Sequence, residues 1–110
     1  MAERVARNDA VFREANEVIR AKAERTGMDG LLPALCECAD PACTELVQLT
    51  PREYEGVRAN STWFINVPGH HVNAHGWARV ISENNRFALV EKVGEAGEIV
   101  EQLDPRSSSE

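Results

Sequence analysis

Residues 36–43 read CECADPAC and bring three cysteines together around the dipeptide Asp40-Pro41. That dipeptide favours a turn, which lets three sulfurs converge from a single loop. Three thiolates and one imidazole form an established tetrahedral zinc site, and three histidines follow later in the chain. We therefore predict that this loop is a zinc knuckle, which one histidine pins to a later segment. The predicted cysteine ligands are Cys36, Cys38 and Cys43.

The fourth ligand has to come from the three histidines, at positions 70, 71 and 75. His70 directly follows Pro68-Gly69, a turn that would hold its side chain rigidly. His71 and His75 have the i,i+4 spacing of helical metal pairs, although the residues between them are more typical of a loop. Spacing alone leaves all three open, and Zn²⁺ is the expected cofactor in each case.

Two other interpretations of the cysteines stay open. Buried free cysteines behave as small hydrophobic residues, in which case the histidines are ordinary loop residues. Alternatively, Cys36 or Cys38 forms a reversible disulfide or attacks a substrate, because neighbouring histidines activate a thiolate. A disulfide framework is disfavoured, since the cysteine count is odd and we expect no secretion signal in the charged N-terminal stretch.

Size and charge narrow the class of protein further. The chain has 110 residues, of which 43% are hydrophobic and 5% aromatic, so we expect one domain with a modest aliphatic core that a bound metal would stabilise. The net charge of −6 disfavours nucleic-acid binding and favours a basic protein partner. Because no apolar run approaches the roughly 20 residues of a membrane helix, we expect a cytoplasmic protein.

Hydrophobic spacing over residues 8–25 predicts an amphipathic N-terminal helix. The side predicted to face the core consists of Val11, Phe12, Ala15, Val18, Ile19, Lys22 and Ala23. The side predicted to face solvent consists of Arg13, Glu14, Glu17, Arg20 and Glu24. Packing of the apolar side on a sheet is favoured over docking in a partner's groove.

The remaining patterns predict short strands and helices. Segments with strand character cover residues 44–49, 62–67, 77–83 and 86–93. A capping box from Thr50 to Glu53 predicts a short helix to about residue 59, and another short helix is expected over residues 95–103. The segments at 28–33 and 71–76 are expected to be connections.

Together these elements predict an α+β fold. We expect an N-terminal amphipathic helix, the zinc-knuckle loop, a short helix and a small antiparallel sheet of about three to four strands. They would form a single small metal-binding domain over residues 8–103, with flexible ends at 1–7 and 104–110.

Several stretches resemble a family of small, uncharacterised bacterial proteins that are common in actinomycetes. The stretches are FREANEVIRAKAERTG, LCECADPACTELVQLTPREYEGVRAN, FINVPGHH and ALVEK, and they cover most of residues 8–92. The knuckle C-E-C-A-D-x-x-C is the most specific part, followed by the P-G-H turn. The resemblance implies four metal ligands: Cys36, Cys38, Cys43 and His70. The chain departs from the family after His70, where an acidic segment is expected. The family brings no established activity.

The predicted site favours a binding protein over an enzyme. Four protein ligands leave no open position at which the metal could activate water, and the zinc deaminase signature is not matched. Ser61 and Ser82 lack a base in a recognisable motif. We expect a small cytosolic zinc-binding module that interacts with another protein or has a regulatory role. A thiol-based redox sensor or metal-responsive sensor is the alternative. Trp63 or Trp77 could anchor a partner, although a core role is favoured for both.

Overall fold

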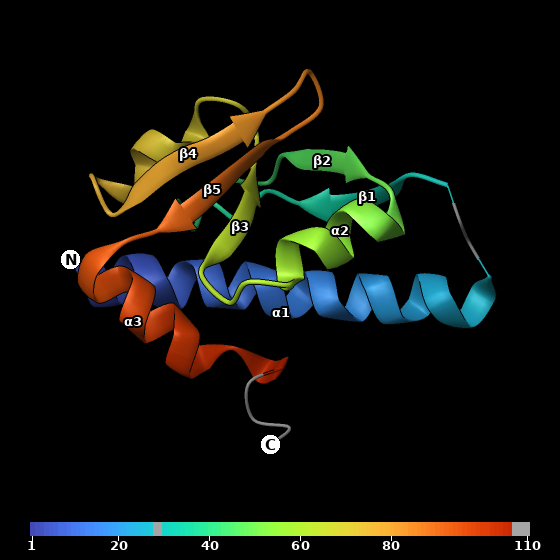
Figure 1. Ribbon diagram of the computed structural model, residues 1–110, viewed down its shortest axis with the longest axis horizontal. Coiled ribbons are helices and arrows are strands. Elements are labelled where there is room, and N and C mark those ends of the chain that lie inside the picture. The colour runs from blue at the N-terminus through green and yellow to red at the C-terminus, as the bar shows by residue number, and fades with distance from the viewer. Residues whose placement is uncertain (28–29, 107–110) are drawn as a thin grey trace.

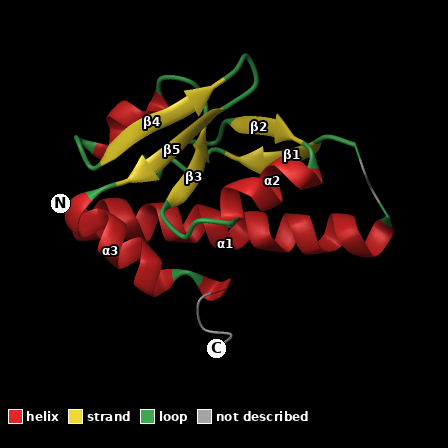
Figure 2. Cartoon of the chain, viewed as in Figure 1, coloured by secondary structure: helices red, strands yellow, loops and turns green. Residues whose placement is uncertain are grey.

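Within residues 1–27 and 30–106, which the computed structural model describes, the chain forms three α-helices, one 3₁₀ helix and five strands. The helices are α1 (Ala2–Thr26), α2 (Pro51–Arg58) and α3 (Gly94–Leu103), and the 3₁₀ helix is η1 (His70–Ala74). The strands are β1 (Leu32–Leu35), β2 (Leu46–Leu49), β3 (Trp63–Asn66), β4 (Ala78–Glu83) and β5 (Ala88–Lys92). The combination of helices and antiparallel strands confirms the α+β class (Figure 2).

The strands form two small antiparallel sheets, where we expected one. β1 pairs with β2, and the second sheet has the order β3-β5-β4, so that β5 is its central strand. The knuckle returns the chain from β1 to β2, and α2 then separates β2 from β3, so the strands fall into two groups. α1 runs along one side of both sheets and α3 packs against it (Figure 1). The knuckle therefore lies next to the sheets and to α1.

Local sequence signals correctly predicted several elements. The Thr50 hydroxyl accepts a hydrogen bond from the Glu53 N–H at 3.1 Å, and the Glu53 carboxylate accepts one from the Thr50 N–H at 2.8 Å. This capping box precedes α2 as predicted. The expected strands and the last expected helix correspond to β2, β3, β4, β5 and α3. Trp63 and Trp77 both pack against clusters of buried hydrophobic residues, which agrees with the core role.

Two predicted connections contain regular structure. Leu32 and Pro33 begin β1, although residues 28–33 were predicted as a connection; residues 28 and 29 lie outside the described part. Pro33 is exposed, and proline is tolerated in such a short strand because a lost backbone donor matters least at a sheet edge. Residues 70–74 form η1 in the segment predicted as a loop.

The first helix differs from the prediction in its start and in its buried side. It begins at Ala2 and not near residue 8, so residues 2–7 are helical and are not a flexible end. Val11 and Val18, predicted to face the core, are 64% and 66% exposed, whereas Arg13, predicted to face solvent, is 1% exposed. The buried residues of α1 are Ala2, Val5, Ala6, Asp9, Arg13, Asn16 and Ala23. None of the described helices is long and apolar enough to cross a membrane.

Polar residues can occupy the buried side of α1 because the sheets provide partners for them. The Arg13 guanidinium stacks 3.6 Å from the centre of the Phe64 ring and donates to the carbonyl oxygens of Ser61 and Trp63. The Asp9 side chain contacts Lys92 on β5, with 2.6 Å between Oδ2 and Nζ, and both side chains are fully buried. The spacing of hydrophobic residues, on which the helix prediction was based, contains no information about these distant partners.

The C-terminal segment is also more ordered than predicted. Asp104 is buried and accepts two hydrogen bonds from the Arg58 guanidinium, at 2.5 and 3.2 Å. Arg106 forms ion pairs with Glu17 and Glu55. Residues 104–106 are therefore fixed to α1 and α2 and do not form the flexible end that we predicted, whereas 107–110 lie outside the described part.

The buried Asp9–Lys92 pair predicts a specific pH dependence of stability. Burial raises the pKa of Asp9 to about 7, although the attraction of Lys92 opposes this shift. Between about pH 4 and 7, the folded protein therefore holds a proton that the unfolded chain has released. The stability contributed by this proton is present in full below about pH 4 and is lost as the pH rises to about 7.

We expect the stability of the wild type relative to Asp9→Asn to fall across that window, by up to about 1.4 kcal/mol per pH unit. Urea unfolding of both proteins at several pH values between 5 and 7.5 measures this difference. Because both proteins keep the cysteines and histidines, the pH dependence of a bound metal is common to both and cancels. A constant difference across the range would contradict the raised pKa.

Candidate metal centre

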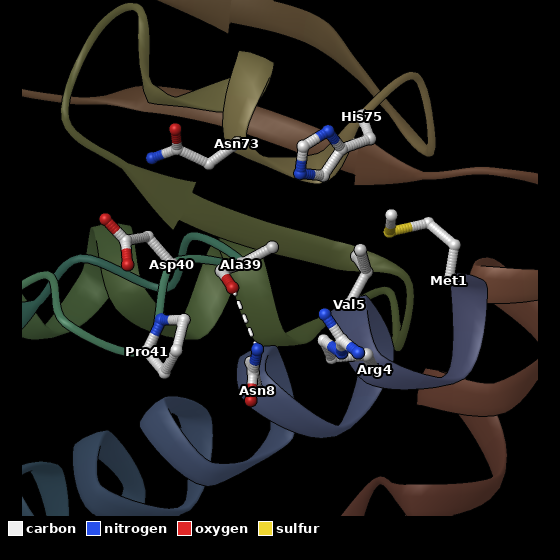
Figure 3. Close-up of a pocket in the computed structure, with 9 residues that line it drawn as sticks. All are labelled: Met1, Arg4, Val5, Asn8, Ala39, Asp40, Pro41, Asn73 and His75. Atoms are coloured by element: carbon white, nitrogen blue, oxygen red, sulfur yellow. Dashed lines mark hydrogen bonds between the residues drawn. The ribbon is translucent and has the colours of Figure 1, made fainter.

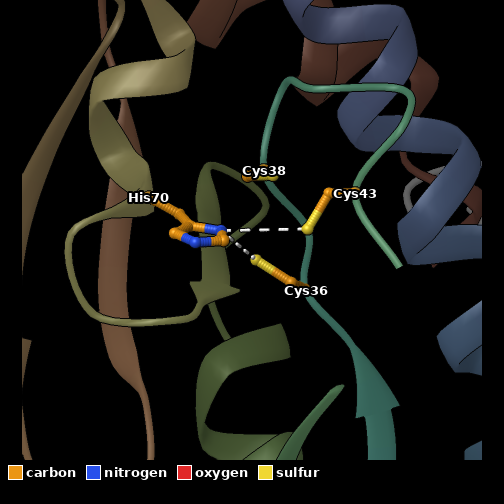
Figure 4. A group of neighbouring side chains, drawn as sticks. All are labelled: Cys36, Cys38, Cys43 and His70. Atoms are coloured by element: carbon orange, nitrogen blue, oxygen red, sulfur yellow. Dashed lines mark hydrogen bonds between the residues drawn. The ribbon is translucent and has the colours of Figure 1, made fainter. Parts of the chain in front are cut away.

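Four potential metal ligands from two separate parts of the chain meet at one point of the structure. The Sγ atoms of Cys36, Cys38 and Cys43 and a ring nitrogen of His70 all lie within 4.8 Å of one another (Figure 4). In a tetrahedral site with metal–sulfur bonds of about 2.3 Å, neighbouring ligand atoms are separated by roughly 3.8 Å. The spacing of the cluster is therefore compatible with metal binding.

Backbone hydrogen bonds shape the knuckle. The Cys36 N–H donates to the Glu45 carbonyl at 3.0 Å, which extends the β1–β2 pairing up to the first cysteine. At the turn, the Asp40 carboxylate accepts from the Ala42 N–H at 2.9 Å, and the Asp40 carbonyl accepts from the Cys43 N–H at 3.1 Å. This Asx turn brings Cys43 back toward the first two cysteines, as the Asp-Pro signal predicts.

The histidine is placed by the turn that precedes it. Gly69 has a φ of 94°, a left-handed conformation that glycine adopts without steric strain. The following residue, His70, is the first residue of η1, and its N–H donates to the Val67 carbonyl at 2.9 Å. Its Nδ1 atom lies 3.5 Å from the Sγ of Cys36 and 3.8 Å from the Sγ of Cys43. Nδ1 is therefore the nitrogen that faces the sulfurs.

The other two histidines lie outside this cluster. His71 is half-buried, and its Nδ1 has no hydrogen-bond partner among the described residues. His75 is exposed and lines a separate pocket of about 260 Å³ between the start of α1 and the knuckle (Figure 3). Asn8 closes one side of that pocket by donating to the Ala39 carbonyl at 2.9 Å. Of the three candidate histidines, His70 is the one that the structure brings to the cysteines.

Hydrogen-bond donors surround the three sulfurs. The Val67 N–H donates to the Sγ of Cys36 at 3.2 Å, and the Asn73 amide donates to the Sγ of Cys38 at 3.5 Å. Backbone N–H groups also reach Cys38 and Cys43, from Asp40 and Glu45 respectively. Such donors favour the thiolate over the thiol, and thiolates are the form that binds metal.

The proximity of the sulfurs to one another has a large effect on their protonation. A hydrogen bond from the Cys36 thiol lowers the pKa of Cys38 to about 4, and the same bond raises the pKa of Cys36. For Cys43, burial is the first cause that raises the pKa of the thiol. The hydrogen bond from Cys36 therefore favours a thiolate at Cys38, and metal binding to the three cysteines would release the remaining thiol protons to the solvent.

A buried carboxylate fixes the knuckle to the rest of the fold. Glu37 lies between two of the cysteines in sequence and is fully buried. Its carboxylate accepts from the Ile65 N–H at 3.1 Å and from the Asn16 amide of α1 at 2.9 Å. Asn16 also exchanges two hydrogen bonds with the backbone of Leu35, at 2.8 and 2.9 Å. Sequence reasoning missed Glu37 and Asn16 as positioning residues, and an acidic residue between two cysteines was the available signal.

Comparison with known proteins gives no independent indication of function. No protein-family model, curated protein or solved structure matches the chain. Function must therefore be inferred from the chemistry of the cluster formed by Cys36, Cys38, Cys43 and His70.

Glu45 is expected to raise the metal affinity of the cluster through His70. Its Oε2 atom lies 3.2 Å from the Nε2 of His70, on the side of the ring opposite the sulfurs. A carboxylate in this position fixes the orientation of the ring and the tautomer that leaves Nδ1 free to bind metal. Because Glu45 is substantially exposed, we expect Glu45→Gln to weaken zinc binding by about tenfold, the lower end of the usual range for such partners.

Competition with a chromophoric chelator measures this change in zinc Kd. Glu83→Gln, an equally conservative change at an exposed position of β4, is the matched control and should leave the Kd unchanged. Equal affinities for Glu45→Gln and Glu83→Gln would show that the carboxylate does not act on the histidine.

Proposed function

We propose that this protein binds one Zn²⁺ ion through Cys36, Cys38, Cys43 and His70, and that the ion has a structural role. The observation that carries the proposal is the convergence of these four ligand atoms within 4.8 Å. Three sulfurs and one nitrogen form a soft donor set, which suits zinc better than magnesium or calcium. The Nδ1–Sγ separations of 3.5 and 3.8 Å are close to those of a tetrahedron around zinc.

A structural role is supported by the segments that the ligands connect. Cys36 directly follows β1, Cys43 precedes β2, and His70 begins η1, some thirty residues further along. An ion bound to all of them would link the β1–β2 pair to the segment that leads into β4. Because the protein fills all four positions, no site is left for a water molecule or a substrate, so we propose a binding module and not an enzyme.

We propose that this module acts in the cytoplasm by interacting with another protein or in a regulatory role. The proposed metal site needs all three thiols in the reduced form, and a reducing compartment keeps them so. The net charge of −6 makes nucleic acid a poor partner. Membership of the actinomycete-type family that the sequence resembles stays a prediction.

A redox or metal-responsive sensor is the second candidate, and the exposure of one cysteine favours it. Cys36 and Cys38 are buried, whereas Cys43 is half-buried beside the exposed turn at residues 40–42. Hydrogen peroxide could reach Cys43 first. Two thiolates would then lose two electrons and form a disulfide, peroxide would be reduced to two hydroxide ions, and the zinc would be released.

Metal analysis distinguishes these possibilities. We expect one zinc per chain in protein purified under reducing conditions, and less than a tenth of that amount in Cys38→Ser. A wild-type protein without zinc, or a variant that keeps its zinc, would overturn the metal proposal. Stoichiometric peroxide should leave the zinc in place if the site is purely structural, and release of the zinc would favour the sensor.

A further inference from the structure

The outward side of α1 has properties that its role in the fold does not explain. Each helical residue turns by about 100°, so Val11 and Val18 point away from the side that packs on the sheets. They are 64% and 66% exposed. Valine is a weaker helix former than alanine, leucine or lysine, and two exposed valines therefore do not serve the stability of the helix itself.

Positively charged residues lie on both sides of Val11 and Val18 along the helix. We define the outer stripe of α1 as six exposed residues: Arg4, Arg7, Val11, Val18, Lys22 and Arg25. The stripe carries four cations and is flanked by two acidic residues: Glu3, which pairs with Arg7 at 3.1 Å, and Glu14 beside its middle. The whole chain, in contrast, has 12 Lys+Arg against 18 Asp+Glu. The charge of the stripe is thus opposite in sign to that of the protein as a whole. The stripe lies on the side of α1 opposite its buried residues.

The pattern of charged and apolar residues disfavours several possible binding partners of the outer stripe. If two copies of α1 packed antiparallel with Val11 against Val18, Arg7 would meet Lys22 and Arg4 would meet Arg25, so a second copy is disfavoured. An anionic membrane calls for larger apolar groups than two valines. A nucleic acid has no apolar side chains to cover these valines, and the acidic remainder of the chain would repel it.

We propose that the outer stripe of α1 binds an acidic amphipathic helix of another protein. Apolar side chains at the middle of that helix cover Val11 and Val18, and carboxylates at its two ends pair with the four cations. The distance along α1 from Arg4 to Arg25 is about 32 Å at roughly 1.5 Å per residue, which matches a partner helix of about 20 residues. The inference rests on the proposed role as a protein-interaction module. For this surface it predicts an acidic partner, although the net charge of the whole chain favours a basic one.

Selection from a display library of 20-residue peptides on the zinc-loaded full chain tests the proposal. We expect enriched peptides to carry Asp or Glu at both ends and Leu, Ile or Phe in the middle. Their Kd, measured by fluorescence anisotropy, should rise at least tenfold with Arg25→Glu or Val18→Ser. Arg52→Glu makes the same charge change at an exposed position of α2 and should leave the Kd within twofold.

Several results would overturn the inference. One is the absence of acidic peptides after selection, and another is equal binding by wild type and Arg25→Glu. A dimer in sedimentation analysis that Val18→Ser dissociates would assign the stripe to a second copy. Binding of phosphatidylserine vesicles or duplex DNA through Arg25, without peptide binding, would assign it to those ligands. Zinc content is measured on the same samples. If zinc is present but no peptide binds, this inference alone is refuted. If zinc is missing but peptides still bind, the metal proposal alone is refuted.

Discussion

Replacing Cys38 with serine is expected to lower the free energy of unfolding by several kcal/mol and to release the bound zinc. Cys38 is fully buried, and the hydrogen bond from Cys36 lowers the pKa of its thiol. A ligand present at 1,000 times its Kd stabilises the folded state by about 4 kcal/mol, and structural zinc sites commonly exceed that ratio. In a small domain, such a loss corresponds to a decrease in Tm of roughly 15 °C or more.

Thermal unfolding with one equivalent of zinc, and again with excess EDTA, separates the metal effect from other effects of the substitution. The wild type should lose a comparable amount of stability when EDTA is added, and Cys38→Ser should lose almost none. His75→Asn is the matched control, because it removes an exposed histidine outside the cluster and asparagine tolerates the left-handed backbone at this position, where φ is 51°. If EDTA left the Tm of the wild type unchanged, zinc would not contribute to the fold.

The parts of the fold that sequence predicted correctly are those with local signals. The capping box of Thr50 and Glu53 involves residues three positions apart, and it gave the start of α2. The hairpin of β4 and β5 was marked by Asn84, whose side chain accepts from the backbone N–H groups of Arg86 and Phe87. In both cases the residues that form the structure are neighbours in the chain, so their types alone carry the information.

The buried side of α1 could not be predicted, because the residues that determine it are distant in sequence. Arg13 is buried because Phe64 accepts its guanidinium on the ring face and Ser61 and Trp63 offer carbonyl oxygens. Nothing in the neighbourhood of Arg13 indicates that such partners exist. Hydrophobic periodicity therefore placed Val18 toward the core and Arg13 toward solvent, the reverse of the structure.

The sequence identified the cysteine ligands of the candidate site, but not which histidine joins them. The residue types and their clustering were sufficient to identify the three cysteines as one group. The choice among the histidines depends on Gly69 and on the direction of η1, which spacing does not encode. Glu45 contacts the ring nitrogen of His70 that faces away from the sulfurs. The two residues are distant in sequence, so this contact could be found only in the three-dimensional structure.

Replacing Asp104 with alanine is expected to destabilise the protein by about 3–5 kcal/mol, the usual loss when one partner of a buried ion pair is removed. The Arg58 side chain is fully buried and donates two hydrogen bonds to this carboxylate, and Arg13 lies 3.7 Å from it. Burial acts to raise the pKa of Asp104, but the hydrogen bonds from Arg58 lower it below its usual value, so the carboxylate is charged at neutral pH. Without it, two buried guanidinium groups lose their shared counterion.

Chemical denaturation of three variants tests whether burial of the charges causes this loss. Arg106→Gln removes a cation that pairs with Glu17 and Glu55 near the surface, and exposed pairs contribute only about 0–1 kcal/mol. The double variant Arg58→Met, Asp104→Leu removes both buried charges and should recover much of the stability lost in Asp104→Ala, because hydrophobic residues can replace a buried pair at little cost. If Asp104→Ala and Arg106→Gln were equally stable, the buried cluster would contribute no more than a surface ion pair does.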